Sequence, residues 1–168
     1  LSRVKTKYAL ILNPDVILEK NFFKEIDNYL DHQINFHIIG IKYKDDSKWK
    51  TSGLFDEFDK KIKSTVKTKS NYDSLEEVDW VIGCAMLINI ENFKTKKIFD
   101  ENIFLYFDEF DLCRRVRSIE GKIYSSKNLF VKHLGNKSSL DLEYVLEFEK
   151  LRNWHWMWST FYYHKKYY

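Results

Sequence analysis

The order of apolar and polar positions predicts strands and helices in alternation at the start of the chain. Residues 8–12 form a short continuous apolar run, which is typical of a strand buried on both faces. Over residues 19–31 the apolar side chains recur at helical spacing on one face, and residues 36–43 form a second apolar run. Strand, helix and strand in this order predict an α/β domain with parallel pairing of the two strands.

The rest of the chain continues with short elements and ends in a long helix. Residues 44–77 are rich in Lys, Asp, Ser and Thr and predict a solvated excursion with a hairpin. From 140 onward, aromatic residues three or four positions apart predict a terminal helix. The expected elements between these segments are strands over 78–83 and 85–90, a short helix over 91–97, a helix over 109–120 capped by Gly121, and strands over 122–125 and 129–133.

Composition narrows the class of protein. A chain of 168 residues with 44% hydrophobic residues is long enough to bury the core of one domain. A net charge of +3 is too balanced for a protein whose main task is to coat nucleic acid. Two cysteines make no disulfide framework and favour a reducing compartment. The longest charge-free apolar stretch, residues 80–90, is too short to span a bilayer, which needs about 20 residues.

The first candidate for chemistry is the turn that follows the first apolar run. Asp15 comes three residues after the expected strand, where ligands bind in open α/β sheets. Its carboxylate, with Asn13 nearby, could hold a hard divalent cation and through it a diphosphate. Asn-Pro-Asp is also a favourable turn sequence, so a purely structural role stays open.

The second candidate is the run of three carboxylates at the expected start of the helix over 109–120. Asp108 as N-cap and Asp111 as its partner would form a capping arrangement that complements the helix dipole. Glu109 has no such task. It could act as a general base if the neighbouring aromatic side chains raise its pKa.

Two further features carry chemistry or an interaction. His133 follows an expected strand, where it is either a structural hydrogen-bonding group or a metal ligand together with Asp15. Arg152, on the terminal helix, could contact a phosphate of a substrate. The aromatic segment 154–158 and the basic end of the helix fit a membrane interface and core packing equally well.

Four segments, in this order, resemble family 2 inverting glycosyltransferases of the GT-A fold, and in particular the bacterial rhamnosyltransferase-like branch that builds cell-surface polysaccharide. They are Leu10–Asp15, Val78–Leu87, Phe99–Arg115 and Val131–Gly135. The resemblance covers most of residues 8–133, and the block around 99–115 is its most specific part. It implies a partial GT-A, Rossmann-like mixed sheet flanked by helices, followed by the aromatic-rich terminal helix.

The resemblance also implies a metal site for Mn²⁺ or Mg²⁺. The Asp-x-Asp motif of the family falls on residues 13–15, with Asn13 in place of the first Asp. Asp15 would therefore be the main metal-binding carboxylate, and Asn13 a weak ligand or sugar contact. The downstream histidine of the family falls on His133, which would help to coordinate the metal.

The catalytic base is implied in the same way. The acidic pair of the family falls on Asp108 and Glu109, in swapped order, so that Glu109 is the base by position and Asp108 is the alternative. Asp79, Trp80 and Gly83 would line the cleft that receives the donor sugar and the acceptor.

The implied function is transfer of a sugar, with inversion, from a nucleotide-sugar donor to a saccharide or polyprenyl-linked acceptor. In the family, a nucleotide-binding portion precedes the metal motif, whereas only seven residues precede Tyr8 here. Residues 1–138 are therefore expected to be the C-terminal part of a GT-A domain, and residues 139–168 a helical tail. The expected location is the cytoplasm, with the tail as a peripheral contact to the inner face of the plasma membrane and no nucleic-acid partner.

Two other classes of function compete with an enzyme. Asn13 and the missing front portion also fit a non-catalytic module that binds a sugar nucleotide or a glycan. The aromatic tail fits a peripheral membrane or partner-binding domain in which residues after Arg152 are the functional part.

Overall fold

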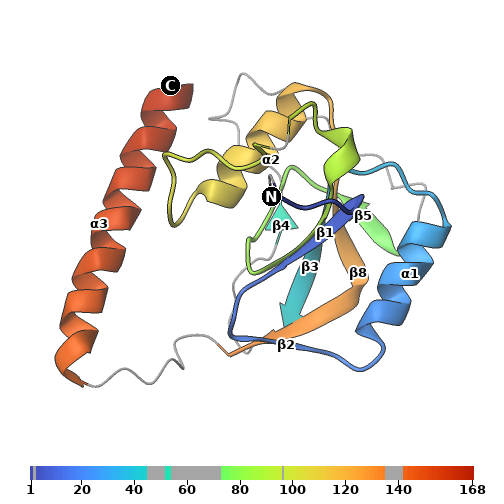
Figure 1. Ribbon diagram of the computed structural model, residues 1–168, viewed down its shortest axis with the longest axis horizontal. Coiled ribbons are helices and arrows are strands. Elements are labelled where there is room, and N and C mark those ends of the chain that lie inside the picture. The colour runs from blue at the N-terminus through green and yellow to red at the C-terminus, as the bar shows by residue number, and fades with distance from the viewer. Residues whose placement is uncertain (2, 45–51, 54–72, 96, 135–141) are drawn as a thin grey trace.

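A mixed α/β fold is seen in the computed structural model, which describes residues 1, 3–44, 52–53, 73–95, 97–134 and 142–168 (Figure 1). A six-stranded sheet has the order β1-β7-β3-β8-β2, and β5 also pairs with β8. Among the described strands, β3 and β8 pair in parallel and the other pairs are antiparallel. The strands of this sheet are β1 Tyr8–Leu12, β2 Val16–Leu18, β3 Ile38–Lys44, β5 Leu75–Glu77, β7 Ala85–Asn89 and β8 Ile123–His133.

The predicted parallel pairing of the first two apolar runs is wrong, because β7 lies between β1 and β3. Both strands pair with β7 in antiparallel register, Leu10 opposite Leu87 in one pair and Ile39 opposite Leu87 in the other. All five residues of β7 are buried, whereas β1 is only half-buried. The fully buried strand β7 therefore has an inner position, and β1 lies at the edge of the sheet.

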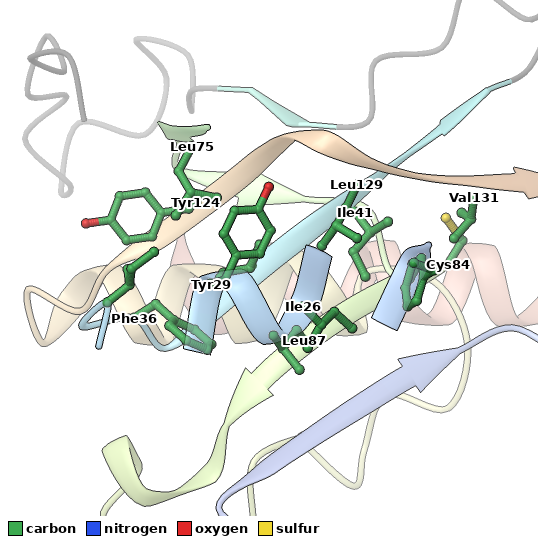
Figure 2. Close-up of a cluster of buried hydrophobic side chains, with 14 residues drawn as sticks. Ile26, Tyr29, Phe36, Ile41, Leu75, Cys84, Leu87, Tyr124, Leu129 and Val131 are labelled. Atoms are coloured by element: carbon green, nitrogen blue, oxygen red, sulfur yellow. The ribbon is translucent and has the colours of Figure 1, made fainter. Parts of the chain in front are cut away.

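Both faces of the sheet are covered, which explains the continuous apolar runs. On β3, Ile38 faces the core beneath α2 and Ile39 faces the core beneath α1. Met86 and Leu87 alternate in the same way on β7, as the two-residue period of a strand requires. Figure 2 shows the core on the α1 side, where side chains from the helix meet those of the strands.

The first helix agrees with the apolar spacing and begins three residues later than predicted. It is α1, Phe22–Asp31, and it buries Phe22, Ile26 and Tyr29 on one face. The Tyr29 hydroxyl reaches the Ser126 hydroxyl at 2.9 Å, so the polar end of this buried ring is satisfied.

Several smaller predictions differ from the structure. The expected helix over 91–97 is only a 3₁₀ turn, η1, Ile90–Asn92, and the two expected strands over 122–133 form the single strand β8. Most of the excursion over 44–77, and the boundary at residue 138, lie outside the described residues. Within that excursion, β4, Ser52–Gly53, pairs with β6, Trp80–Val81.

Two helices complete the fold. They are α2, Asp108–Ser118, and α3, Leu142–Tyr167, which stands beside α2 and the loop that precedes it (Figure 1). Gly121 closes α2 by donating its N–H to Val116 O at 2.9 Å, and a Cβ here would lie 2.6 Å from Val116 Cγ1. Among the described residues, no helix is long and apolar enough to cross a membrane.

Candidate functional site

Asp15 and His133 lie side by side at the end of the sheet. The antiparallel pairing of β2 and β8 sets Val16 opposite His133, and the Leu134 N–H donates to Asp15 O at 3.0 Å. As a result, Asp15 Oδ1 is 3.2 Å from His133 Nε2. Both side chains are partly exposed, at 33% and 24% respectively, whereas the His133 Nε2 atom that faces Asp15 is buried. The two residues named as metal ligands are thus neighbours.

Asn13 shapes the turn that carries Asp15. Its N–H donates to Cys84 O at 2.9 Å, and its carbonyl accepts from the Val16 N–H at 3.3 Å. The tripeptide is therefore a turn, as the structural interpretation of the sequence held. The Cys84 contact also brings this turn against the Gly83–Cys84 corner between β6 and β7.

Glu109 reaches the same corner from the first turn of α2. A Cβ added at Gly83 would lie 3.5 Å from Glu109 Cβ and 3.7 Å from its Oε2. Burial, together with the charge and hydrogen bond of Asp108, raises the pKa of Glu109 to about 8, although a hydrogen bond from the Gly83 backbone opposes the rise. Near neutral pH the Glu109 side chain is therefore mostly protonated, and it becomes a proton acceptor as the pH approaches about 8.

Cys84 links the two halves of the site. The pKa of the Cys84 thiol is raised to about 11, mainly by burial and in smaller part by the negative charges of Glu109 and Asp15. Both carboxylates therefore act on one sulfur atom. Four segments that are far apart in sequence, at residues 13–15, 83–84, 108–109 and 133, meet around this corner.

The predicted capping box at 108–111 is wrong. Phe107 is the N-cap of α2, in a left-handed conformation, and no side chain caps the helix there. Asp108 is already the first helical residue, and Asp111 points elsewhere. Its buried carboxylate accepts from Lys166 Nζ and Tyr167 Oη, both at 2.6 Å, because α3 brings a lysine and a tyrosine from a distant part of the sequence.

The turn before the acidic pair is strained and is held by α3. Tyr106 and Phe107 have φ values of 64° and 62°, a conformation that bulky side chains rarely adopt and that costs about 1–3 kcal/mol per residue. Arg152 Nε donates to the Tyr106 hydroxyl at 2.8 Å, and the Phe107 ring packs against Trp156 with centroids 5.5 Å apart. Contacts with α3 therefore help to fix the backbone of this turn, which leads into α2 and so positions Glu109.

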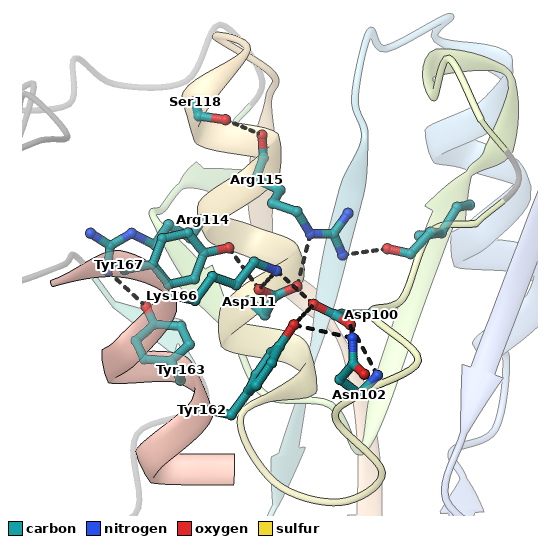
Figure 3. A network of polar contacts seen from close by, with 11 residues as sticks. Asp100, Asn102, Asp111, Arg114, Arg115, Ser118, Tyr162, Tyr163, Lys166 and Tyr167 are labelled. Atoms are coloured by element: carbon teal, nitrogen blue, oxygen red, sulfur yellow. Dashed lines mark hydrogen bonds and ion pairs between the residues drawn. The ribbon is translucent and has the colours of Figure 1, made fainter.

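A polar network joins the C-terminal end of α3 to α2 and to the loop over residues 100–107 (Figure 3). Lys166 Nζ bridges Asp100 and Asp111, at 2.7 and 2.6 Å. Although burial opposes it, hydrogen bonds from Lys166 and Asn102 hold the pKa of Asp100 well below its usual range. Arg114 lies over the Tyr167 ring, 4.2 Å from its centroid, and contributes a cation–π contact to the same joint.

The other candidate residues named from the sequence are Trp80, Asp79 and Arg152, and each lies in a different environment. The Trp80 ring packs on Phe110 with centroids 5.2 Å apart, next to the corner that holds Glu109. Asp79 is buried, and its Oδ1 lies 3.0 Å from Arg117 Nε, so its charge is balanced within the protein. Arg152 borders an open cavity of about 330 Å³ beside the strained turn. Tyr106, Glu149, Asn153 and Trp156 line the rest of it.

Sequence reasoning did not identify the residues that hold the strained turn. Tyr106 was expected only among the aromatic neighbours of Glu109, and Trp156 only in a segment that fits a membrane interface or the core, whereas their contact joins segments fifty residues apart in sequence. Ser159 is buried and donates to Leu105 O at 2.7 Å, although an isolated serine in a helix carries no signal of its own. The high proportion of aromatic residues over 104–107 was the one feature of the sequence that could have indicated these contacts.

The donor set at the turn fits a divalent cation in part. Among the described residues, no group of three His, Cys, Asp or Glu side chains converges on one point. Asp15 and His133 together would offer a cation two donor atoms, an oxygen and a nitrogen. Mg²⁺ is commonly held by one or two carboxylates, with substrate phosphates and water at the other positions, and Mn²⁺ accepts the mixed pair.

The raised pKa of Glu109 predicts a distinctive pH dependence of stability. Between its ordinary pKa of 4.5 and about 8, the folded state holds a proton that the unfolded state has lost. Stability is therefore fully present below about 4.5 and falls as the pH rises through about 8. The Glu109→Gln side chain cannot ionise. The midpoint temperature of unfolding of this variant should therefore rise relative to that of the wild type as the pH increases across this range.

Thermal unfolding followed by circular dichroism over that pH range checks this prediction. Glu101→Gln is the matched control, because the Glu101 side chain is 77% exposed and should leave the pH profile unchanged. Parallel profiles for the wild type and Glu109→Gln would mean that Glu109 ionises as an ordinary carboxyl group.

No known protein-family model matches the chain. The chain is 24% identical, over 166 residues, to rhamnosyltransferase WbbL of Escherichia coli K12. The match includes 93% of this chain and 61% of WbbL, so the chain spans less than two thirds of the length of that relative. The chain is therefore distantly similar, over nearly its whole length, to a glycosyltransferase.

Proposed function

We propose that the protein to which this chain belongs is an inverting glycosyltransferase, and that residues 13–15, 83–84, 108–109 and 133 form its reaction centre. The observation that carries the proposal is the convergence of the Asp15–His133 pair and the Asp108–Glu109 pair on one corner of the fold. A diphosphate leaving group needs positive charge or hydrogen-bond donors, and an attacking hydroxyl needs a base. The similarity to a rhamnosyltransferase supports the same reaction class.

In the proposed reaction, an acceptor hydroxyl attacks the anomeric carbon of the donor sugar from the side opposite the diphosphate. Glu109 takes the proton of that hydroxyl as the new carbon–oxygen bond forms. The bond from the anomeric carbon to the diphosphate oxygen breaks, and the nucleoside diphosphate leaves with the electron pair. One displacement inverts the configuration at the anomeric carbon. Asp108 maintains the raised pKa of Glu109, which strengthens it as a base.

Asp15 and His133 are the residues that would hold a divalent cation, Mn²⁺ or Mg²⁺. When bound, such an ion would neutralise charge on the leaving diphosphate. We assign Asn13 a weak contact from the same turn, which is supported by the backbone hydrogen bonds that hold it near Asp15. Trp80 and Gly83 border Glu109, and we assign them to the cleft that receives the two sugars.

The substrates follow from the same proposal. The donor is a nucleotide-activated sugar, with rhamnose the first to test because the relative is named for rhamnosyl transfer. The acceptor is a saccharide or a polyprenyl-linked glycan in the synthesis of cell-surface polysaccharide. Asp79 is assigned no contact with substrate, because Arg117 balances its charge in the interior.

Calorimetric titration of Mn²⁺, with and without a nucleoside diphosphate, tests the metal half of this site. We expect binding that the diphosphate strengthens and that Asp15→Ala and His133→Ala each weaken by about tenfold or more. Asp31→Ala is the control, since Asp31 ends α1 and is exposed. Equal Mn²⁺ affinity in Asp15→Ala and the wild type would place any metal elsewhere.

A further inference from the structure

The helix α3 presents two different faces. One face carries Arg152, Ser159, Tyr163 and Lys166, which contact the loop over 100–107 and α2. The other carries a row of apolar residues three or four positions apart, whose members are between 40% and 63% exposed. This aromatic stripe consists of Leu151, Trp154, Met157, Trp158 and Phe161.

The aromatic stripe is a continuous surface. The rings of Trp154 and Trp158 are stacked, with centroids 6.2 Å apart and an interplanar angle of 7°. Phe161 continues the row, 6.3 Å from Trp158. Trp158 Nε1 donates to Asn102 O at 3.0 Å, which satisfies its polar atom on the protein side. An exposed apolar surface of this extent marks an interaction site.

The charges around the aromatic stripe identify the class of partner. The sequence from Lys150 to the C-terminal residue of the chain contains no Asp or Glu, and the nearest acidic residue on the side of the stripe is Glu147, one turn before Leu151. Lys150 and Lys165 lie at the two ends of the stripe on the same side of the helix, and Lys165 Nζ is 5.9 Å from the centre of the Phe161 ring. A helix with Trp and Phe on one face and basic residues beside them is typical of segments that lie in an anionic membrane interface.

A groove next to the aromatic stripe fits the headgroup of an anionic lipid. It has a volume of about 410 Å³ and is lined by Asn102, Trp158, Phe161, Tyr162, Lys165 and Lys166. Lys166 is already paired with Asp100 and Asp111, whereas Lys165 forms no ion pair with the described residues, so we assign Lys165 the contact with a ligand. An aromatic wall beside a lysine suits a phosphate that is attached to acyl chains.

We propose that the aromatic stripe docks on an anionic phospholipid surface, with α3 lying along the membrane and its other face holding the turn before Asp108. The tryptophans sit at the level of the headgroups, and Lys165 contacts a lipid phosphate. This surface does not depend on the sugar-transfer chemistry, because its residues are distinct from the reaction centre.

Co-sedimentation with lipid vesicles tests the proposal on the purified protein. We expect binding to vesicles of phosphatidylcholine mixed with phosphatidylglycerol, and little binding to phosphatidylcholine alone. Replacing Trp154 and Phe161 together by Ser should lower the affinity about tenfold or more. Lys165→Glu should weaken binding to the anionic vesicles, and added salt should do the same.

Phe23→Ser is the matched control, because Phe23 is an equally exposed aromatic residue on α1, at 62%. It should bind vesicles like the wild type, and circular dichroism should show that every variant is folded. Full vesicle binding by the double variant, or equal binding to neutral and anionic vesicles, overturns the proposal. So does a wild-type protein that binds no vesicle and instead forms a dimer that the double variant loses.

Discussion

Replacing Glu109 by Gln is expected to lower kcat for sugar transfer by about 10²–10⁴-fold, which is the usual contribution of general base catalysis. The amide keeps the size of the side chain and its position beside Gly83, but it cannot take a proton from the acceptor. The KM for the donor should change little, because the base contacts the attacking hydroxyl rather than the diphosphate. Initial rates of the protein that contains this chain, measured with nucleotide-activated rhamnose, give both constants.

The Asp108→Asn variant tests whether Glu109 or Asp108 is the catalytic base. Removing that negative charge should lower the pKa of Glu109, because Asp108 contributes to its rise. The acid limb of the pH–rate profile should then move to lower pH, and the variant should keep a larger share of kcat than Glu109→Gln. The reverse order of the two variants would assign the base to Asp108 and contradict the account.

Replacing Asp111 by Ala is expected to destabilise the folded protein by about 3 kcal/mol. The Asp111 carboxylate is fully buried and accepts from Lys166, Tyr167 and Arg115, with Arg115 Nε at 2.8 Å. Its loss would leave partly buried cations without their partner, and α3 would lose its main polar anchor. Urea unfolding followed by circular dichroism measures the change in the free energy of unfolding.

Glu101→Ala provides the comparison for Asp111→Ala. Glu101 forms an ion pair with Lys97 at 3.4 Å, but both side chains are more than 70% exposed, and such pairs contribute little. An equally small effect of Asp111→Ala would mean that the end of α3 is not anchored through this carboxylate. The same variant should also weaken catalysis, because α3 helps to hold the strained turn before Glu109.

The elements that depend on local periodicity could be predicted from the sequence. The apolar spacing over 19–31 indicated α1, and the tail pattern indicated α3, because a helix buries residues three and four apart. The pairing of strands could not be predicted in this way. The insertion of β7 between β1 and β3 depends on which strand buries most apolar surface on both faces, and this is settled by the whole sheet.

The candidate site was predictable only where a motif carried it. Asp15, His133 and Glu109 were identified from motif order, and the structure brings Asp15 and His133 together. Their roles in metal binding and proton transfer stay predictions. The capping role of Asp108 and Asp111 was inferred from local spacing alone. It was wrong because Lys166 and Tyr167 reach Asp111 from the other end of the chain.

The central claim is that one displacement, assisted by Glu109, moves the sugar at the corner formed by Gly83 and Cys84. Proton NMR of the first product, recorded before the anomers of any free sugar equilibrate, reports the configuration at the transferred anomeric carbon. The account predicts a configuration opposite to that of the donor, formed by the wild type and nearly lost in Glu109→Gln. A product that keeps the configuration of the donor would contradict it.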